Sequence, residues 1–329
     1  MMKDYEVVLA SGAEHLGLRF KEHGYTVYRS AANYDSRRMF PNGDLYVRIP
    51  RISRLSGRRV VVVQSCTASG PDEQEQYSTA DRLIELLLML DLLNNPISVE
   101  EVAHKSYCAT PVEPPSRIEV VLTFQPFALQ DKAFKTGEAV SGKWAMEMIA
   151  KACDKIWVLN PHAPDSLDWM KNLIDTGKLE IVDIVPDLVE FAAKQFEFKE
   201  YLVITPDEGG QERFDCEGFG KSRTNSFSVE LSGDLEVKGK NIIVIDDLTK
   251  SGSTLLKAAD RLRKQGSKEV ALAVAHVLPL VDLGEELLEN LVMKIESNIV
   301  ASNTIRTHVF SVKNPELTYN VVDKLVKIL

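Results

Sequence analysis

The amino-acid sequence predicts an α/β protein with two doubly wound domains and mainly parallel sheets. Short apolar runs alternate with longer amphipathic segments along the chain, which is typical of parallel strands joined by crossover helices. This alternation begins again in the second half of the sequence. The length of 329 residues also suits two domains of about 150 residues each.

In the first half, the clearest expected strand is Arg59–Gln64, because its Val60–Val63 run is apolar at every position. Such a run indicates a strand that is buried on both faces. The other expected strands are Tyr5–Ala10, Tyr25–Tyr28, Asp44–Ile49 and Glu119–Thr123, and the expected helices are Ser11–Gly24, Glu73–Leu93 and Ser141–Ala152. Asn94–Pro115 contains several prolines and is expected to be a surface excursion, to which we assign no function.

The second half repeats the pattern and ends in an amphipathic segment. Its expected strands are Ile156–Asn160, Glu180–Ile184, Tyr201–Thr205, Asn241–Ile245, Glu269–His276 and Asn298–Ser302. Apolar positions recur at helical spacing within Pro315–Leu329, so we expect a terminal helix that covers another surface. The predicted organisation is a first domain over residues 1–154, a second over residues 155–310, and a C-terminal helix within residues 311–329 that packs back on the first domain.

Composition argues against several classes of protein. The net charge of −9 is unlike that of a nucleic-acid-binding domain, which normally carries a basic face. No apolar run approaches the roughly 20 residues of a membrane span, and the N-terminus shows no apolar signal region. We therefore expect a cytoplasmic protein that binds neither nucleic acid nor a membrane. The cysteines form no C-x-x-C pair, so we expect buried, reduced thiols at Cys66, Cys108, Cys153 and Cys216.

The most informative segment follows the expected strand Asn241–Ile245. Two adjacent carboxylates, Asp246 and Asp247, come directly after this strand. Ligands of open α/β sheets bind at the carboxyl ends of strands, where two carboxylates can accept hydrogen bonds from ribose hydroxyls or hold magnesium. The turn that follows leads into a helix N-terminus, which favours a phosphate, and it contains Lys250, Ser251, Gly252, Ser253 and Thr254. The alternative interpretation is structural: Asp246 ends a strand and Asp247 begins a turn.

The whole string Ile242–Thr254 resembles the ribose-5-phosphate loop of the phosphoribosyltransferase superfamily. Other segments narrow the resemblance. In chain order they are Phe40–Asp44, Val63–Ser65, Gln130–Lys132, Gly137–Ser141, Asn160–His162, Pro206–Gly210, Lys221–Arg223 and Ser302–Ile305. Together they resemble the ribose-phosphate pyrophosphokinases over nearly the whole chain, in a divergent form.

This resemblance implies two phosphoribosyltransferase-like domains with the active site between them. It implies transfer of the diphosphoryl group of ATP to the 1-hydroxyl of ribose 5-phosphate, which gives phosphoribosyl pyrophosphate and AMP, with Mg²⁺ as the metal. It also implies a homo-oligomer with the active site near a subunit interface, where the Phe40–Asp44 loop reaches the nucleotide of a neighbouring subunit.

The resemblance further implies roles for individual residues. Lys221 and Arg223 would be catalytic, because cations must meet the charge that develops on the transferred group. His162 and Asp207 would bind the metal or the metal–nucleotide complex. The nucleotide would be bound by Phe40, Asn42, Asp44, Gln130 and Asp131, and ribose 5-phosphate by Asp246, Asp247, Lys250, Ser251, Gly252, Ser253 and Thr254. Without the resemblance, the ordinary interpretation of His162 would be an exposed histidine, and that of Lys221–Arg223 would be a solvated turn.

Several positions depart from the family pattern. Leu129 stands where the family usually has an arginine, so a cation for the nucleotide phosphates is missing. Asn42 and Asp44 replace an aspartate and a glutamate, and Lys250 replaces an acidic residue. Two alternatives therefore stay open beside the diphosphokinase: a catalytically weakened regulatory or assembly partner of an active synthetase, and a phosphoribosyltransferase that consumes the same product.

Overall fold

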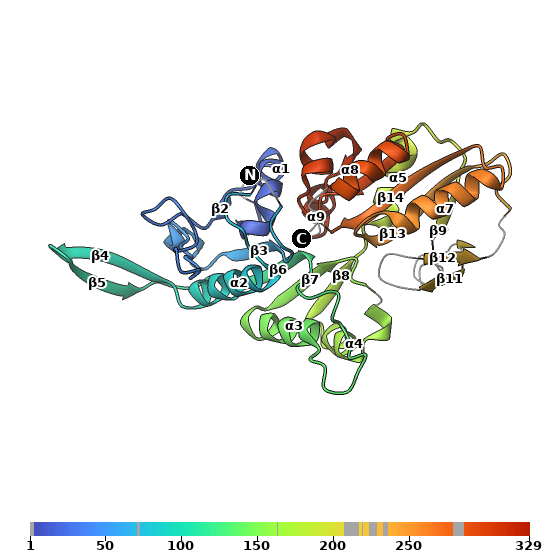
Figure 1. Ribbon diagram of the computed structural model, residues 1–329. Coiled ribbons are helices and arrows are strands. Elements are labelled where there is room, and N and C mark those ends of the chain that lie inside the picture. The colour runs from blue at the N-terminus through green and yellow to red at the C-terminus, as the bar shows by residue number, and fades with distance from the viewer. Residues whose placement is uncertain are drawn as a thin grey trace. The chain divides into compact units, whose positions relative to one another are not determined.

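The chain divides into two compact units in a computed structural model (Figure 1). The structure describes residues 3–70, 73–162, 164–206, 217–218, 220–223, 229–232, 236–278 and 286–329. The first unit consists of Met1–Ser69, Glu73–Val182 and Leu325–Leu329, and the second of Gly70–Asp72 and Asp183–Lys324. Each unit has its own sheet and its own apolar core.

The first unit is built on a parallel sheet. Its strands follow the spatial order β2 (Val27–Arg29), β1 (Glu6–Leu9), β3 (Arg59–Ser65), β6 (Arg117–Phe124), β7 (Lys155–Leu159) and β8 (Leu179–Val182). Its α-helices are α1 (Gly17–Glu22), α2 (Thr79–Asn94), α3 (Ser141–Ala152) and α4 (Asp168–Asp175), with shorter 3-10 turns η1 (Ser11–Leu16), η2 (Ile52–Leu55) and η3 (Pro164–Ser166). The apolar run Val60–Val63 is fully buried, as expected for a central parallel strand.

The second unit has a parallel sheet of the same kind. The spatial order is β10 (Glu217–Gly218), β9 (Leu202–Thr205), β13 (Asn241–Thr249), β14 (Glu269–Val277), β15 (Ile299–Ser302) and β16 (Thr318–Tyr319). Its helices are α5 (Val185–Gln195), α7 (Ser253–Lys264), α8 (Glu286–Lys294), the π-helix η4 (His308–Lys313), the 3-10 turn η5 (Pro315–Leu317) and α9 (Val322–Ile328), whose end belongs to the first unit. A separate antiparallel pair joins β11 (Gly220–Arg223) to β12 (Val229–Ser232).

The two sheets share one topology. Within each described sheet, the strands lie in the spatial order second, first, third, fourth, fifth and sixth along the chain. The direction of winding therefore reverses between the first and third strands, which are β1 and β3 in one unit and β9 and β13 in the other. In doubly wound sheets, ligands bind beyond the carboxyl ends of the strands at such a switch point.

The division between the units differs from the predicted boundary between residues 154 and 155. It falls after Val182, because β7 pairs with β6 and β8 pairs with β7 in the first sheet. A run of strand–helix units does not reveal which sheet each strand joins, so the sequence placed β7 and β8 in the wrong half. The last residues, Leu325–Leu329, group with the first unit, where Arg59 Nη1 donates to the Leu329 carbonyl over 2.6 Å.

Several predicted elements also differ from the observed ones. Asp44–Ile49 is not a strand, and its only pairing in the described chain is an isolated bridge between Met39 and Leu45. The long helix begins at Thr79 rather than Glu73, because Ser78 and Asp81 form a reciprocal capping box. The predicted terminal helix is divided into η5, β16 and α9.

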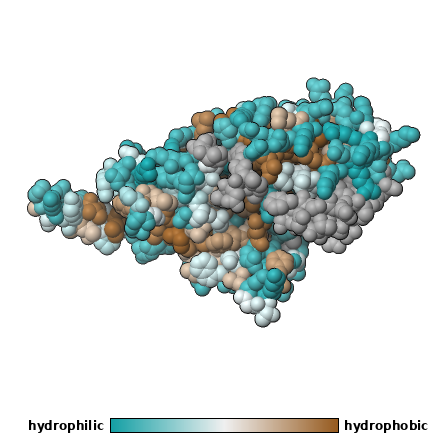
Figure 2. Space-filling view, in the orientation of Figure 1, coloured by the Kyte–Doolittle hydropathy of each residue, from teal (hydrophilic) through white to brown (hydrophobic). Residues whose placement is uncertain are grey.

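The predicted surface excursion Asn94–Pro115 is a β-hairpin. Strands β4 (Ile97–Ala103) and β5 (Ser106–Pro111) pair only with each other among the described strands, and every residue in them is exposed. The hairpin extends away from the rest of its unit in Figure 1. Figure 2 shows apolar and hydrophilic residues mixed along it, in agreement with the exposure of Ile97, Val99 and Tyr107. No helix in the described residues is both long and apolar enough to cross a membrane.

Candidate active site

The predicted ribose-phosphate loop lies at the switch point of the second unit. Strand β13 extends to Thr249, beyond the predicted end at Ile245, and pairs with β14 through Asp246, Leu248 and Thr249. Asp246 is half-buried, whereas Asp247 is only 6% exposed. Side chains alternate between the faces of a strand, so the two carboxylates occupy different environments, with Asp246 the more accessible.

The turn after β13 requires a glycine. Gly252 has φ +68°, and a Cβ placed there would lie 2.4 Å from Leu291 Cδ2. The amide of Gly252 donates to Thr249 Oγ1 over 3.0 Å, and the amide of Ser253 donates to Ser251 Oγ over 3.4 Å. These bonds shape a tight turn that ends at the first residue of α7, where the helix dipole favours an anion. Lys250 is half-buried beside this turn.

Buried polar groups support the neighbouring strand ends. His276, 3% exposed, places Nδ1 2.9 Å from Thr304 Oγ1. Thr304 Oγ1 is also bonded to the Ala275 carbonyl over 2.9 Å. Ser302 Oγ also donates to Ala275, over 2.5 Å. The Ser302–Ile305 motif therefore fixes the ends of β14 and β15, and it was the only sequence signal for this cluster.

The predicted nucleotide loop Phe40–Asp44 is a small closed turn in the first unit. Phe40 donates its amide to the Asp44 carbonyl over 2.8 Å, and Asn42 Nδ2 donates to Asp44 Oδ2 over 2.7 Å. The Phe40 ring packs edge-on against Tyr46, with ring centroids 5.9 Å apart. The structure thus brings Phe40, Asn42 and Asp44 together, with the two polar side chains exposed.

Gln130 and Asp131 lie in the segment between β6 and α3. Gln130 is half-buried and donates from Nε2 to the Lys132 carbonyl over 3.2 Å. Asp131 is buried, and its carbonyl accepts a hydrogen bond from Trp169 Nε1 over 2.9 Å. Leu129, at the position of the missing arginine, is 52% exposed. This part of the chain therefore presents an apolar side chain to solvent where the family pattern has a cation.

Of the remaining predicted site residues, the structure describes only some. His162 is exposed and follows β7 in the first unit, just after Asn160, which has φ +36°. Asp207 lies outside the described residues, as do the side chains of Lys221 and Arg223, whose backbones form part of β11. In the described part of the chain, no three His, Cys, Asp or Glu side chains converge as a metal site would require.

The switch point of the first unit contains a buried polar cluster that the sequence did not reveal. Here the amide of Ser11 donates to Glu85 Oε2 over 3.1 Å, and the amide of Gly12 donates to Gln64 Oε1 over 2.9 Å. Gln64 Nε2 in turn donates to Glu85 Oε2 over 3.1 Å. A Cβ at Gly12 would lie 2.2 Å from the Ser65 carbonyl, so nothing larger fits.

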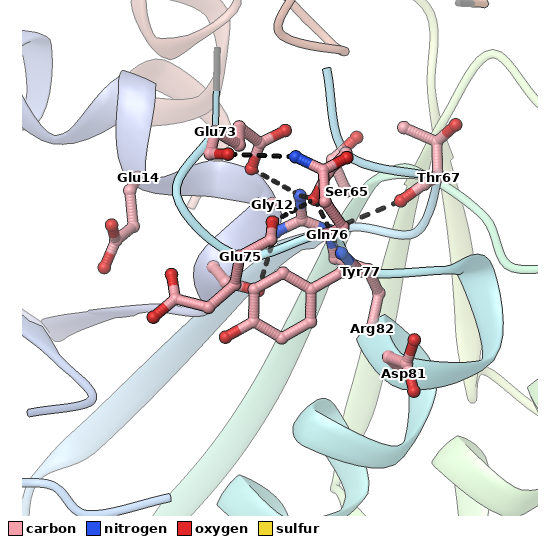
Figure 3. Close-up of polar contacts among 12 residues, drawn as sticks. Gly12, Glu14, Ser65, Thr67, Glu73, Glu75, Gln76, Tyr77, Asp81 and Arg82 are labelled. Carbon is pink, nitrogen blue, oxygen red and sulfur yellow. Dashed lines mark hydrogen bonds and ion pairs between the residues drawn. The ribbon is translucent and has the colours of Figure 1, made fainter. Parts of the chain in front are cut away.

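Arg82 balances the buried carboxylate of Glu85. Its guanidinium donates to Ser11 Oγ and to Glu73 Oε2, both over 2.6 Å, and to the Thr67 carbonyl over 3.3 Å. It also lies 4.7 Å from the ring centroid of Tyr77, and Figure 3 shows Glu73, Thr67 and Tyr77 around it. Burial raises the pKa of Glu85, against the opposing effect of the Ser11 hydrogen bonds and of Arg82. We call Ser11, Gly12, Gln64, Arg82 and Glu85 the first-unit switch cluster.

Comparison with known proteins identifies relatives along the whole chain. The family model for the phosphoribosyl transferase domain matches residues 217–309. A ribose-phosphate pyrophosphokinase from Pyrococcus abyssi is 28% identical, over 98% of this chain and 97% of its own length. One from Pyrococcus furiosus is 27% identical, over 92% of this chain and 95% of its own length. The chain is therefore similar to ribose-phosphate pyrophosphokinases over nearly its whole length.

A solved structure agrees with the predicted fold class. The crystal structure of phosphoribosylpyrophosphate synthetase from Mycobacterium smegmatis matches with a TM-score of 0.70 at 22% identity and covers 99% of this chain and 97% of that chain. The ribose-phosphate pyrophosphokinase fold therefore extends through both units. The residues matched by the family model include the loop after β13. The predicted resemblance to this family and the predicted two-domain α/β fold are thus confirmed.

Proposed function

We propose that this chain is a ribose-phosphate diphosphokinase, which transfers the diphosphoryl group of ATP to the 1-hydroxyl of ribose 5-phosphate and releases AMP. The observation that carries this proposal is the loop after β13, where Asp246 and Asp247 precede a glycine turn at the start of α7. Similarity to ribose-phosphate pyrophosphokinases over both units supports the same reaction, because a phosphoribosyltransferase with one such domain would leave the first unit unexplained.

The second unit would bind ribose 5-phosphate. The 5-phosphate would lie at the N-terminus of α7, where the hydroxyl groups of Ser251, Ser253 and Thr254 can donate and Lys250 adds positive charge. The ribose hydroxyls would donate to the carboxylates, chiefly to Asp246 because it is the more accessible. Gly252 would let the backbone approach the phosphate.

The first unit would bind the nucleotide. Phe40 would stack on adenine, while Asn42 and Asp44 supply both donors and acceptors to its edge. Gln130 would bind the phosphate chain, and Asp131 would contribute through its few exposed atoms. The exposed Leu129 leaves one phosphate contact of the family unmade.

Magnesium would be held mainly by the nucleotide. Mg²⁺ prefers oxygen ligands and commonly binds through phosphates with only one or two protein groups. His162 is exposed at the carboxyl end of β7, so it is available to the metal–nucleotide complex, and Asp207 would supply a carboxylate. When bound, the ion would neutralise charge on the phosphates.

Lys221 and Arg223 would stabilise the transfer itself. The 1-hydroxyl of the sugar attacks the β-phosphorus of ATP, the bond to the α-phosphate oxygen breaks, and AMP leaves. Phosphoryl-type transfer asks little covalent work of the protein, so cations directed at the transferred group provide most of the acceleration.

Assembly and location complete the proposal. We expect a homo-oligomer in which the Phe40–Asp44 loop reaches the nucleotide of a neighbouring subunit, and we expect the protein in the cytoplasm. Light scattering on purified protein would test the assembly, and a monomeric mass at working concentration would contradict it.

AMP release tests the reaction directly. Purified protein with Mg²⁺ and ATP should release AMP only when ribose 5-phosphate is added, and Lys221→Ala should lower the rate by at least about 100-fold. If ribose 5-phosphate binds but no AMP appears, the chain is instead a weakened partner of an active synthetase. The uncharged, exposed Leu129 would then be the first position to restore as arginine.

A further inference from the structure

We propose that Arg38 is a positioning residue that holds the nucleotide loop Phe40–Asp44 in place from the first-unit switch cluster. This inference rests on the proposed role of that loop in binding the nucleotide. Arg38 itself lies outside the loop and is not one of the predicted site residues.

Arg38 is fixed at its side chain, its amide and its carbonyl. The guanidinium forms a two-pronged ion pair with Glu14, with Nη1 2.8 Å from Oε1 and Nη2 2.9 Å from Oε2. The bond from Nη2 is charge-assisted, and with Nη1 close to the second oxygen it restricts the direction of the Arg38 side chain as well as its distance from Glu14. The Arg38 amide donates to Glu75 Oε1 over 3.0 Å, and its carbonyl accepts the amide of Tyr46 over 2.8 Å.

Glu14 is anchored through the turn that contains it. It lies in η1, which begins at Ser11 and Gly12. The amides of those two residues are bound to Glu85 and Gln64 in the switch cluster. Because η1 starts inside this buried network, the backbone that carries the Glu14 side chain is held in place.

Glu75 is anchored through Arg82. Its carbonyl accepts Ser69 Oγ over 2.9 Å, and Ser69 Oγ is itself bound by Arg82 Nη2 over 3.1 Å. The flanking residues Glu73 and Tyr77 contact the same guanidinium, as Figure 3 shows. Both acidic partners of Arg38 are therefore connected to the first-unit switch cluster.

Arg38 connects this anchor to the base of the loop. It precedes the Met39–Leu45 bridge by one residue, and the bond from Tyr46 to its carbonyl continues that pairing. Tyr46 also supports the Phe40 ring. Removing the Arg38 side chain would leave the base of the turn held only by the amide and carbonyl bonds of residue 38, so binding of the nucleotide would have to supply the ordering that the ion pair with Glu14 now provides.

Steady-state kinetics of Arg38→Ala, with each substrate varied, test the inference. We expect the KM for ATP to rise about tenfold, the equivalent of about 1.4 kcal/mol, while the KM for ribose 5-phosphate changes less than about twofold. The matched control is Arg37→Ala, because Arg37 is exposed and its backbone contacts Asn33. This control should leave both KM values unchanged.

A double-mutant cycle separates positioning from simple loss of charge. Glu14→Gln should raise the KM for ATP as Arg38→Ala does. The double variant should be no worse than either single variant, because each single variant already removes the same Arg38–Glu14 ion pair. Arg38→Lys keeps the charge but loses the two-pronged geometry, so its KM for ATP should be intermediate. Thermal melting shows whether each variant is folded, and Glu14→Gln and Arg38→Lys carry the test if Arg38→Ala is not.

The outcomes distinguish this inference from the proposed function. If the unaltered chain neither binds ATP in calorimetry nor releases AMP, the proposed function fails, and the inference fails with it. If the unaltered chain is active but folded Arg38 and Glu14 variants keep the normal KM for ATP, only the inference is overturned. Equal increases in both KM values would also overturn it, since that result indicates a general loss of structure.

Discussion

The two switch points of this chain have the same topology, but one is filled by buried side chains and the other carries a turn of small residues. In the first unit, the amide of Ser11 donates to the carboxylate of Glu85 and the amide of Gly12 donates to Gln64, while Arg82 binds the Ser11 hydroxyl. In the second unit, the corresponding edge of the sheet carries a turn of small residues at the start of α7. The comparison teaches that the doubly wound fold provides a place for an anion, and that the sequence decides whether the protein fills it with its own side chain.

Glycine marks both places for different physical reasons. Gly12 is required because a Cβ would collide with the Ser65 carbonyl, so it closes the first site. Gly252 is required because its backbone is left-handed and Leu291 lies against it, so it shapes the turn of the second site. The first switch point is therefore structural, and the second is available to a ligand.

The largest expected effect comes from opening the closed site. Glu85→Ala removes the acceptor of the Ser11 amide and of Gln64 Nε2 and leaves these buried donors unsatisfied, so it should lower the free energy of unfolding by about 3 kcal/mol. Urea unfolding measures this loss. The second-unit variant Asp247→Asn is the comparison, and it should change stability by less than about 1 kcal/mol. Equal losses in the two variants would show that the sites do not differ in the way described.

A smaller effect is expected from distorting the open site. Gly252→Ala places a methyl group against Leu291 in a left-handed turn, which should weaken ribose 5-phosphate binding about tenfold, or about 1.4 kcal/mol. Gly239→Ala is the control, because Gly239 also has positive φ but nothing lies within 4 Å of a Cβ there. Binding that falls equally in both variants would indicate backbone strain alone rather than the shape of the turn.

The closed site should also give stability a distinctive pH dependence. Burial raises the pKa of Glu85 above its unfolded value of about 4.3. The contribution of Glu85 to the free energy of unfolding is therefore complete below that pH, and it falls as the pH rises through the pKa of the folded state. The stability of the unaltered protein relative to Glu85→Gln should therefore decline as the pH rises above about 4.3. Denaturant unfolding across this range measures the difference, and a difference that grows with pH would contradict the assignment.

The sequence predicted most of the described strands of the two sheets and the family resemblance because those signals are local. The apolar run of β3 and the string from Ile242 to Thr254 each lie in one continuous segment, so periodicity and residue type were sufficient. The closed switch point is different, since Glu85 and Ser11 are 74 positions apart and meet only in the folded unit. Within α2, Glu85 read as an ordinary polar position of an amphipathic helix.

The sequence also could not predict which sheet a strand joins or which conformation a loop adopts. Strands β7 and β8 have the same local pattern as strands of the second unit, and only their pairing with β6 assigns them to the first. Asp44–Ile49 alternates like a strand, yet its turn is determined by contacts of Phe40 and Arg38. Tertiary contacts decided both cases against local propensity.

The smallest effect is expected from the β4–β5 hairpin. It pairs with no other described strand, and the Val112 amide closes its base by donating to the Pro96 carbonyl over 2.8 Å. Replacing Ile97–Pro111 by a short Gly-Ser linker should change the stability of the chain by less than about 1 kcal/mol. AMP release should also be unchanged, whereas its loss would place the hairpin in the working part of the molecule.

Calorimetric titration of ribose 5-phosphate tests the central difference between the two sites most directly. We expect one site per chain, which Asp246→Asn with Asp247→Asn abolishes while the melting temperature stays the same. Glu85→Gln, if folded, should bind the sugar phosphate as the unaltered chain does. Undiminished binding to the doubly altered second unit, or a second site gained in Glu85→Gln at ordinary concentration, would contradict the assignment of the ligand to the loop after β13.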